Sequence, residues 1–153
     1  KAPLLTNPHI DAAIEKIKTF PETDTSEIAA IGYCFGGFVV LNAAKLGADL
    51  KGVVTFHGGL SGVAPQKGLL KAKILVCHGG ADVFENPHVD EFKKQMDSVG
   101  ADYKFIVFPG ATHAFTNPES TENGIKFNMP IKYDAAADTA SWNDMKGFFR
   151  KLF

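Results

Sequence analysis

The stretch Gly32-Tyr33-Cys34-Phe35-Gly36-Gly37 decides the fold, because it joins an apolar run at residues 28–31 to a helix-like segment at residues 38–46. Glycines stand two positions before and two positions after the cysteine. This spacing fits the G-x-S-x-G nucleophile elbow, a strained strand-to-helix turn whose neighbours must lack side chains. Cysteine replaces the serine of that motif, so the stretch predicts a cysteine nucleophile at the end of a strand.

Cys34 is placed to be reactive. The attacking form of a cysteine is the thiolate, and the free N–H groups and dipole of a helix that begins at the next residues stabilise a negative charge there. The alternative is a buried, inert thiol, which is common for a free cysteine in a protein core. The glycines on both sides favour the reactive interpretation.

The composition predicts one soluble globular domain over residues 1–153, with 45% hydrophobic and 22% charged residues. The 16 basic residues are scattered among 17 acidic ones, so no basic stripe is available for nucleic acid. No apolar run is long enough for a membrane span, and no secretion signal is present in this sequence. Two cysteines far apart do not form a disulfide framework, which favours the cytoplasm.

Alternating signals predict an α/β fold, a parallel sheet with helices on both faces. We expect strands at residues 26–33, 52–56, 74–77 and 103–108, and helices at residues 8–20, 38–46, 86–99 and 135–152. The polar segment 116–133 is expected to be structureless. It is either a cover for the site or a solvated surface excursion, and the sequence does not decide between them.

Three reactive side chains follow predicted strands, at the edge where open α/β sheets bind ligands. Cys34 follows the first strand, Asp82 the third and His113 the fourth. The order nucleophile, acid, histidine is that of α/β-hydrolases. We expect His113 to accept the thiol proton and return it to the leaving group, Asp82 to fix the histidine tautomer, and the backbone N–H of Phe35 to bind the oxyanion.

Several other residues are weaker candidates. Glu85 is the reserve candidate for the acid, and His57 follows the second strand, where it could line the cleft or be structural. Cys77 lies inside an apolar strand and is expected in the core. No C-x-x-C or H-x-x-x-H spacing links the cysteines and histidines, so we expect no metal and no other cofactor.

Three blocks of the sequence, residues 32–37, 78–82 and 112–118, resemble the dienelactone hydrolase family, the cysteine branch of the α/β-hydrolases. The resemblance covers nearly the whole chain. It implies hydrolysis of a small-molecule lactone or carboxylic ester by a Cys34-His113-Asp82 triad, through an acyl-cysteine intermediate and without a cofactor.

The chain departs from the family in two ways. Family members carry strands ahead of the elbow that supply a second oxyanion N–H and a glutamate near the thiol. We therefore expect this chain to be the C-terminal portion of a larger α/β-hydrolase domain. One sheet edge would then be unpaired unless another chain or copy covers it, and the isolated chain would hydrolyse activated esters poorly or not at all.

The second departure concerns the substrate. The family binds a substrate carboxylate with arginines, but the only arginine here is Arg150, in the final helix. Tyr33, Phe35 and Phe115 would instead form an apolar aromatic pocket, so a neutral ester or lactone suits the site as well as dienelactone. Two other functions stay open. The chain could be a non-catalytic α/β-hydrolase-like binding or structural module. Cys34 could also have a redox role, although no second cysteine that could resolve its oxidised form lies nearby in the sequence.

Overall fold

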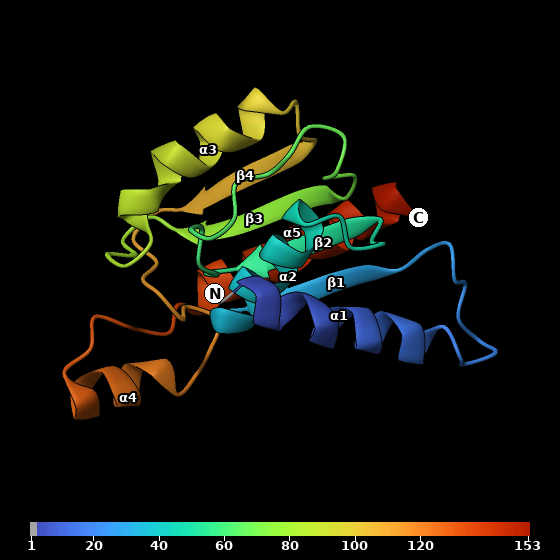
Figure 1. Cartoon of the computed structure of the whole chain (residues 1–153). Coiled ribbons are helices and arrows are strands. Elements are labelled where there is room, and N and C mark those ends of the chain that lie inside the picture. Colours follow the sequence, from blue (N-terminus) through green and yellow to red (C-terminus); the bar gives the residue numbers. More distant parts are fainter. Residues whose placement is uncertain (1–2) are drawn as a thin grey trace.

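The computed structural model describes residues 3–153, with side chains from residue 8 onward. Its centre is a parallel four-stranded sheet in which every strand lies beside the next one in the chain (Figure 1). The strands are β1 (Ala29–Tyr33), β2 (Gly52–Phe56), β3 (Lys73–Gly79) and β4 (Tyr103–Phe108). The expected α/β architecture is confirmed, and β2 and β4 have the predicted bounds.

Helices cover both faces of this sheet because neighbouring strand residues point to opposite sides. Val53 and Val54 are adjacent in β2 and both fully buried, one in each of two core clusters. The first cluster lies under α1, α2 and α3, and the second under α5 (Figure 1). The helices are α1 (Pro3–Ile17), α2 (Phe35–Lys45), α3 (Val89–Ser98), α4 (Ser120–Phe127) and α5 (Ala135–Leu152).

The prediction of a buried strand at residues 26–33 is wrong in its start and in its burial. β1 begins at Ala29, and Ile31 and Tyr33 are 42% and 40% exposed. The reason is that β1 pairs with β2 alone among the described residues, so its other edge is open to solvent. The expected unpaired edge is therefore present, and what covers it stays a prediction.

Three helix starts also differ from expectation. α1 begins at Pro3, so Pro8 lies inside the helix instead of opening it. Proline has a nearly helical φ, so it marks an early helical position without fixing the first residue. α2 starts at Phe35, three residues before the predicted position, because the turn at Cys34 leads directly into the helix. The expected start at Asn86 is a short 3₁₀ turn that continues into α3.

The prediction that segment 116–133 is structureless is wrong, since it contains α4. The polar residues and Gly124 weaken the helix signal in the sequence. Gly124 is required by packing instead, because a Cβ there would collide with the carbonyl oxygen of Ile131. Asn128, with φ of 50°, ends the helix in the left-handed conformation. α4 projects from the body of the molecule (Figure 1). None of the described helices could cross a bilayer.

Candidate active site

Cys34 occupies a strained turn between β1 and α2. Its φ and ψ are 50° and −119°, a conformation that residues with side chains seldom adopt. Its N–H donates to the carbonyl of Phe56 at 3.0 Å, which ties the turn to the end of β2. A Cβ on Gly32 would collide with the backbone of Gly36. Gly36 itself faces open space, so within the described structure only the first of the two motif glycines is required sterically.

The structure brings Cys34, His113 and Asp82 together in one chain of contacts. Nε2 of His113 lies 3.1 Å from Sγ of Cys34, and Nδ1 of His113 lies 2.8 Å from Oδ2 of Asp82. Asp82 is fully buried, whereas Cys34 is exposed. Cys34 is therefore accessible from solvent while the Asp82 carboxylate beside the histidine is shielded from it.

The turn after β3 holds the Asp82 carboxylate in place. Its Oδ1 accepts hydrogen bonds from the backbone N–H groups of Phe84 and Glu85 at 3.0 and 3.2 Å. Burial would raise the pKa of Asp82, but the hydrogen bonds from His113 and from these amides outweigh it and hold that pKa below its usual value. Glu85, the reserve candidate, instead accepts the N–H of Leu60 at 2.8 Å.

His113 is held as a cation in neutral solution. Burial alone would lower its pKa, but hydrogen bonds to Asp82 and Cys34 raise the pKa of His113 to about 9. Nε2 of this ring lies 3.1 Å from the Cys34 sulfur, which is within reach for a proton transfer.

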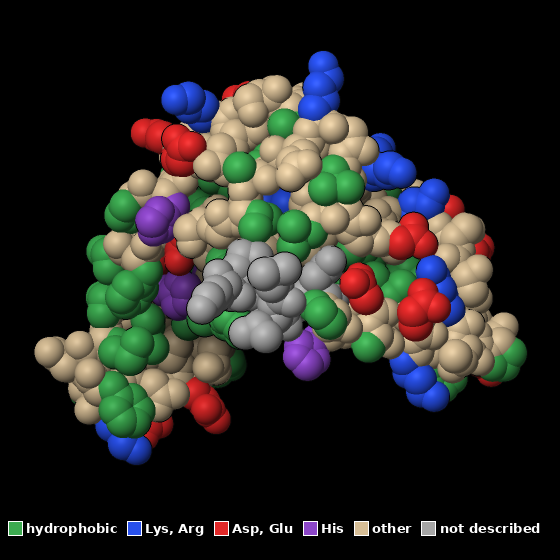
Figure 2. Space-filling model, in the orientation of Figure 1, with side chains coloured by type: hydrophobic (Ala, Val, Ile, Leu, Met, Phe, Trp, Pro, Cys, Tyr) green, Lys and Arg blue, Asp and Glu red, His purple; other side chains and the backbone are tan. Residues whose placement is uncertain are grey.

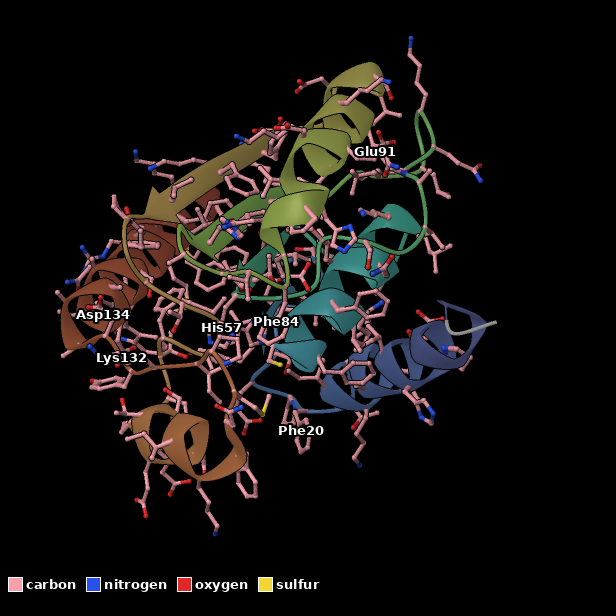
Figure 3. The ribbon with its side chains drawn as sticks, turned by 90° about the vertical axis from the view of Figure 1, so that its left-hand side faces the viewer. Phe20, His57, Phe84, Glu91, Lys132 and Asp134 are labelled. Carbon is pink, nitrogen blue, oxygen red and sulfur yellow. The ribbon has the colours of Figure 1, made fainter. Side chains whose placement is uncertain are left out.

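Aromatic rings fix the His113 imidazole on two sides. His57 meets it at a centroid distance of 5.3 Å, and Phe84 meets it edge-on at 5.6 Å; Figure 3 labels both rings. His57 is buried, and its Nε2 lies 2.8 Å from Oγ1 of Thr116. Burial, with the nearby His113 charge, lowers the pKa of His57 to about 4. His57 thus packs behind His113 as a neutral ring.

A cavity of about 650 Å³ opens beside Cys34 and His113. Its walls are mostly apolar, and Figure 2 shows hydrophobic side chains gathered on the left-hand side of the molecule, above the projecting α4. The apolar lining comprises Phe35, Phe38, Phe84, Ala114, Met129 and Ile131. Met129 and Ile131 come from the segment after α4, so this part of the chain forms one wall of the cavity.

Of the four residues expected in the substrate pocket, Phe35 lines this cavity and the other three do not. Phe115 is fully buried and packs on Phe108 in the core. Tyr33 stacks on Phe56 at a centroid distance of 4.6 Å. His57 lies behind His113, as described above. Cys77 is fully buried, as expected, and burial raises the pKa of its thiol to about 12.

The family model for the dienelactone hydrolase family matches residues 3–153. The chain belongs to the dienelactone hydrolase family. An uncharacterised protein of Caenorhabditis elegans is 34% identical over 95% of this chain and 93% of its own length. The solved structure of a dienelactone hydrolase-like promiscuous phosphotriesterase from metagenomic libraries has a TM-score of 0.87 and 35% identity over 97% of this chain.

The chain matches only part of the length of several relatives in the family. It spans 62% of that phosphotriesterase. A protein of Methylorubrum extorquens whose name suggests a carboxymethylenebutenolidase is 30% identical over 69% of this chain and 40% of its own length. These relatives support a hydrolase with an α/β-hydrolase fold.

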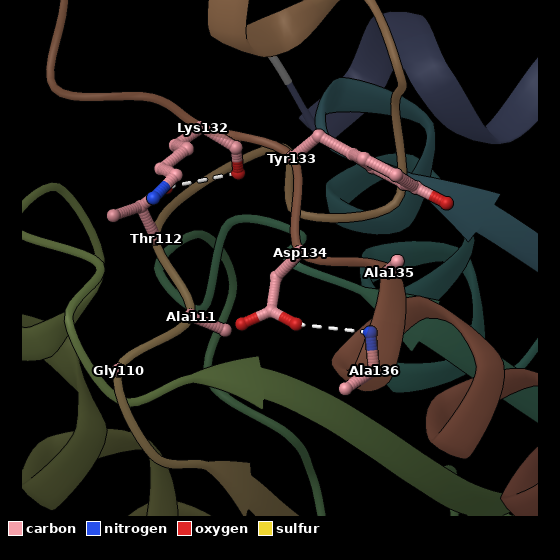
Figure 4. A pocket seen from close by; sticks show the side chains of 8 residues that line it. All are labelled: Gly110, Ala111, Thr112, Lys132, Tyr133, Asp134, Ala135 and Ala136. Carbon is pink, nitrogen blue, oxygen red and sulfur yellow. Dashed lines mark hydrogen bonds between the residues drawn. The ribbon is translucent and has the colours of Figure 1, made fainter.

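A second hollow of about 410 Å³ in this family member lies at the start of α5 (Figure 4). Lys132 and Asp134 line it, but Asp134 caps the helix by accepting the N–H groups of Ala136 and Ala137. The cap already satisfies the amides that could hold an anion. The described side chains also contain no group of three His, Cys, Asp or Glu residues arranged around a metal position.

Proposed function

We propose that this chain hydrolyses carboxylic esters or lactones through Cys34 and an acyl-cysteine intermediate. The observation that carries the proposal is the continuous contact from Sγ of Cys34 through both ring nitrogens of His113 to Asp82, at 3.1 and 2.8 Å. Nucleophilic catalysis needs this arrangement, a nucleophile in reach of a base that is itself oriented by a third group.

The first half of the reaction forms a thioester. His113 holds the proton released by Cys34, and the thiolate attacks the carbonyl carbon of the substrate to give a tetrahedral oxyanion. The intermediate then expels the alkoxide, which takes the proton from Nε2 of His113 and leaves as an alcohol. In a lactone the alcohol stays attached to the acyl group, because the ring opens at this step.

The second half restores the enzyme. His113 is now neutral and removes a proton from a water molecule, whose oxygen attacks the thioester carbon. The carbon-sulfur bond breaks, the carboxylic acid leaves, and the proton on His113 returns to the Cys34 sulfur or remains on the imidazole of the ion pair. Each cycle consumes one ester or lactone and one water.

The backbone N–H of Phe35 is our candidate oxyanion donor. Phe35 is the first residue of α2, and the first N–H groups of a helix have no acceptor within the helix. This amide directly follows the nucleophile, and the helix dipole adds positive potential at the same point.

The apolar cavity supplies the space for a small-molecule substrate. Both cysteines are free, which suits the reducing cytoplasm that we propose as its compartment.

The direct test is a burst experiment with p-nitrophenyl acetate. We expect p-nitrophenolate release that approaches one equivalent per chain, and intact-mass detection of an acetyl group on Cys34 at early times. Cys34→Ala should abolish both signals, and the matched variant Cys77→Ala should retain them. A chain that forms no acyl adduct at Cys34 is the non-catalytic module considered above, and the proposal is then wrong.

Phosphotriester hydrolysis is a second candidate. The observation that favours it is the 35% identity and TM-score of 0.87 to the promiscuous phosphotriesterase. A neutral triester carries no charge that the apolar cavity would reject. The Cys34 thiolate would displace the leaving group at phosphorus, and water would then cleave the sulfur-phosphorus bond, releasing the phosphodiester and the free cysteine. Release of p-nitrophenolate from paraoxon, absent in Cys34→Ala, would support this activity.

A further inference from the structure

We propose that Glu85 sets the charge selectivity of the site and excludes anionic substrates, so that the chain acts on neutral esters or lactones with apolar acyl groups. The substrate class rests on the hydrolase activity proposed above. The charge selectivity rests on the cavity alone.

Among the described residues, the cavity lining carries one carboxylate and no lysine or arginine. Its ionisable residues are Cys34, His113 and Glu85. Cys34 lies 3.1 Å from His113, and His113 in turn lies 2.8 Å from the buried Asp82 carboxylate, so the positive charge of a protonated His113 is already compensated by Asp82. Arg150, the only arginine, lies on α5 and does not line the cavity. Glu85 is therefore the uncompensated charge on the described wall of the cavity.

The Glu85 side chain is fixed at the wall. Its Oε2 accepts the N–H of Leu60 at 2.8 Å, which joins the loop after β3 to the loop after β2. Its own N–H donates to Oδ1 of Asp82 at 3.2 Å. The first bond holds the Glu85 carboxylate and the second holds its backbone, so the residue is fixed at both ends on the cavity wall. Its position is thus tied to the same turn that positions the histidine-orienting Asp82.

The surroundings strengthen the effect of this charge. Phe38, Phe84, Met129 and Ile131 share the cavity with Glu85 and offer no polar atoms to an anion. A substrate carboxylate that enters here finds the Ser61 hydroxyl but no lysine or arginine among the described lining residues, and it faces the charge of Glu85. Selectivity against a ligand is commonly built from such a repulsive element.

The test compares two alkylating reagents of nearly the same shape, neutral iodoacetamide and anionic iodoacetate, each normalised to its rate with free cysteine. Labelling is followed at Cys34 by mass spectrometry, because Cys77 is buried. Glu85→Gln keeps an oxygen for the Leu60 N–H and removes the charge. We expect the ratio of iodoacetamide to iodoacetate rates to fall about five- to tenfold in this variant.

Glu122→Gln is the matched control, since Glu122 is an exposed carboxylate on α4 outside the cavity lining. It should leave the ratio within twofold of the parent value. A ratio that is unchanged in Glu85→Gln, or that moves equally in both variants, overturns the proposal.

A matched ester pair separates this proposal from the hydrolase activity. p-Nitrophenyl butyrate is neutral, and mono-p-nitrophenyl succinate carries a carboxylate at the end of a similar acyl chain. If Glu85→Gln changes the alkylation ratio but neither ester is hydrolysed by the parent chain, the hydrolase proposal fails and the charge selectivity stands. If the esters are hydrolysed at a ratio that Glu85→Gln does not change, the selectivity proposal fails alone.

Discussion

Oδ2 of Asp82 lies 2.8 Å from Nδ1 of His113, within hydrogen-bond distance. Asp82 is fully buried, so solvent does not reach the carboxylate that accepts this bond. This relationship explains why the pKa of His113 is raised to about 9 although burial works against it. It also links the chemistry of the site to the pH dependence of the whole molecule.

Asp82→Asn should reduce the rate of acyl transfer by roughly 10² to 10⁴, because the asparagine amide supports the wrong histidine tautomer. The pKa of His113 should fall, so the alkaline limb of kcat/KM should move from near pH 9 to lower pH. The measurement is a pH-rate profile of both proteins with p-nitrophenyl acetate. An unchanged alkaline limb in the variant would argue against the assigned role of Asp82.

The same pair should make stability depend on pH. The pKa of His113 is raised from 6.5 in the unfolded chain to about 9 in the folded one, so its contribution is fully present below pH 6.5 and is lost as the pH rises through 9. Urea unfolding of the parent and of His113→Gln between pH 6 and pH 10 should show the difference between them shrinking with pH. A difference that grows with pH contradicts the ion pair.

Gly32→Ala and Gly36→Ala should have opposite effects on stability. A Cβ at Gly32 collides with the backbone of Gly36, whereas a Cβ at Gly36 meets nothing within 4 Å. We expect Gly32→Ala to lower the free energy of unfolding by about 1–3 kcal/mol. Gly36→Ala, in the first turn of α2, should leave it unchanged or raise it by about 0.5–1 kcal/mol. Equal destabilisation by both variants, measured by urea unfolding, would show that the elbow is packed differently.

Lys45→Met should stabilise the protein near neutral pH. The Lys45 Nζ is buried without a hydrogen-bond partner, 5.2 Å from the centroid of the Phe92 ring, and burial lowers its pKa from 10.5 to about 8. Between pH 8 and 10.5 the unfolded chain therefore binds more protons at Lys45 than the folded chain does. The free energy of unfolding of the parent should rise with pH over this range, and that of Lys45→Met should not. The expected gain below pH 8 is on the order of 3 kcal/mol at most, since the Phe92 ring offsets part of it.

Ile31→Lys should reduce self-association. Ile31 is 42% exposed on the unpaired edge strand β1, where it lines a groove of about 430 Å³ with Ile17 and Phe153. Exposed apolar edge strands pair with other chains, and a lysine on such a strand opposes pairing. Sedimentation velocity over a concentration series should show fewer oligomers for the variant. The exposed control Ile125→Lys, on α4, should not change the distribution.

The meeting of Cys34, Asp82 and His113 could be predicted because each residue carries a local signal. A glycine-framed cysteine after an apolar run marks the elbow, and the ends of parallel strands lie at one edge of the sheet, which brings Cys34, Asp82 and His113 together. The bounds of β2 and β4 were predictable for the same reason, since Gly58-Gly59 and Pro109-Gly110 follow their apolar runs.

The cavity lining could not be predicted in this way. Tyr33 alternates away from the site because it is the strand residue before the turn, and Phe115 turns inward after Ala114, whose φ is 59°. Met129 and Ile131 reach the cavity only because α4 folds where the sequence shows a polar, glycine-containing segment. These placements depend on tertiary packing and on backbone conformations that no local pattern specifies.

The most direct measurement of the central claim is the pH dependence of Cys34 alkylation by iodoacetamide in the parent chain and in His113→Ala. The account predicts rapid, stoichiometric labelling of the parent at neutral pH, where His113 is protonated, and labelling of His113→Ala that is slow at neutral pH and accelerates only in alkaline solution. Profiles that coincide in the two proteins would mean that the imidazole does not control the thiol, and the account would be contradicted.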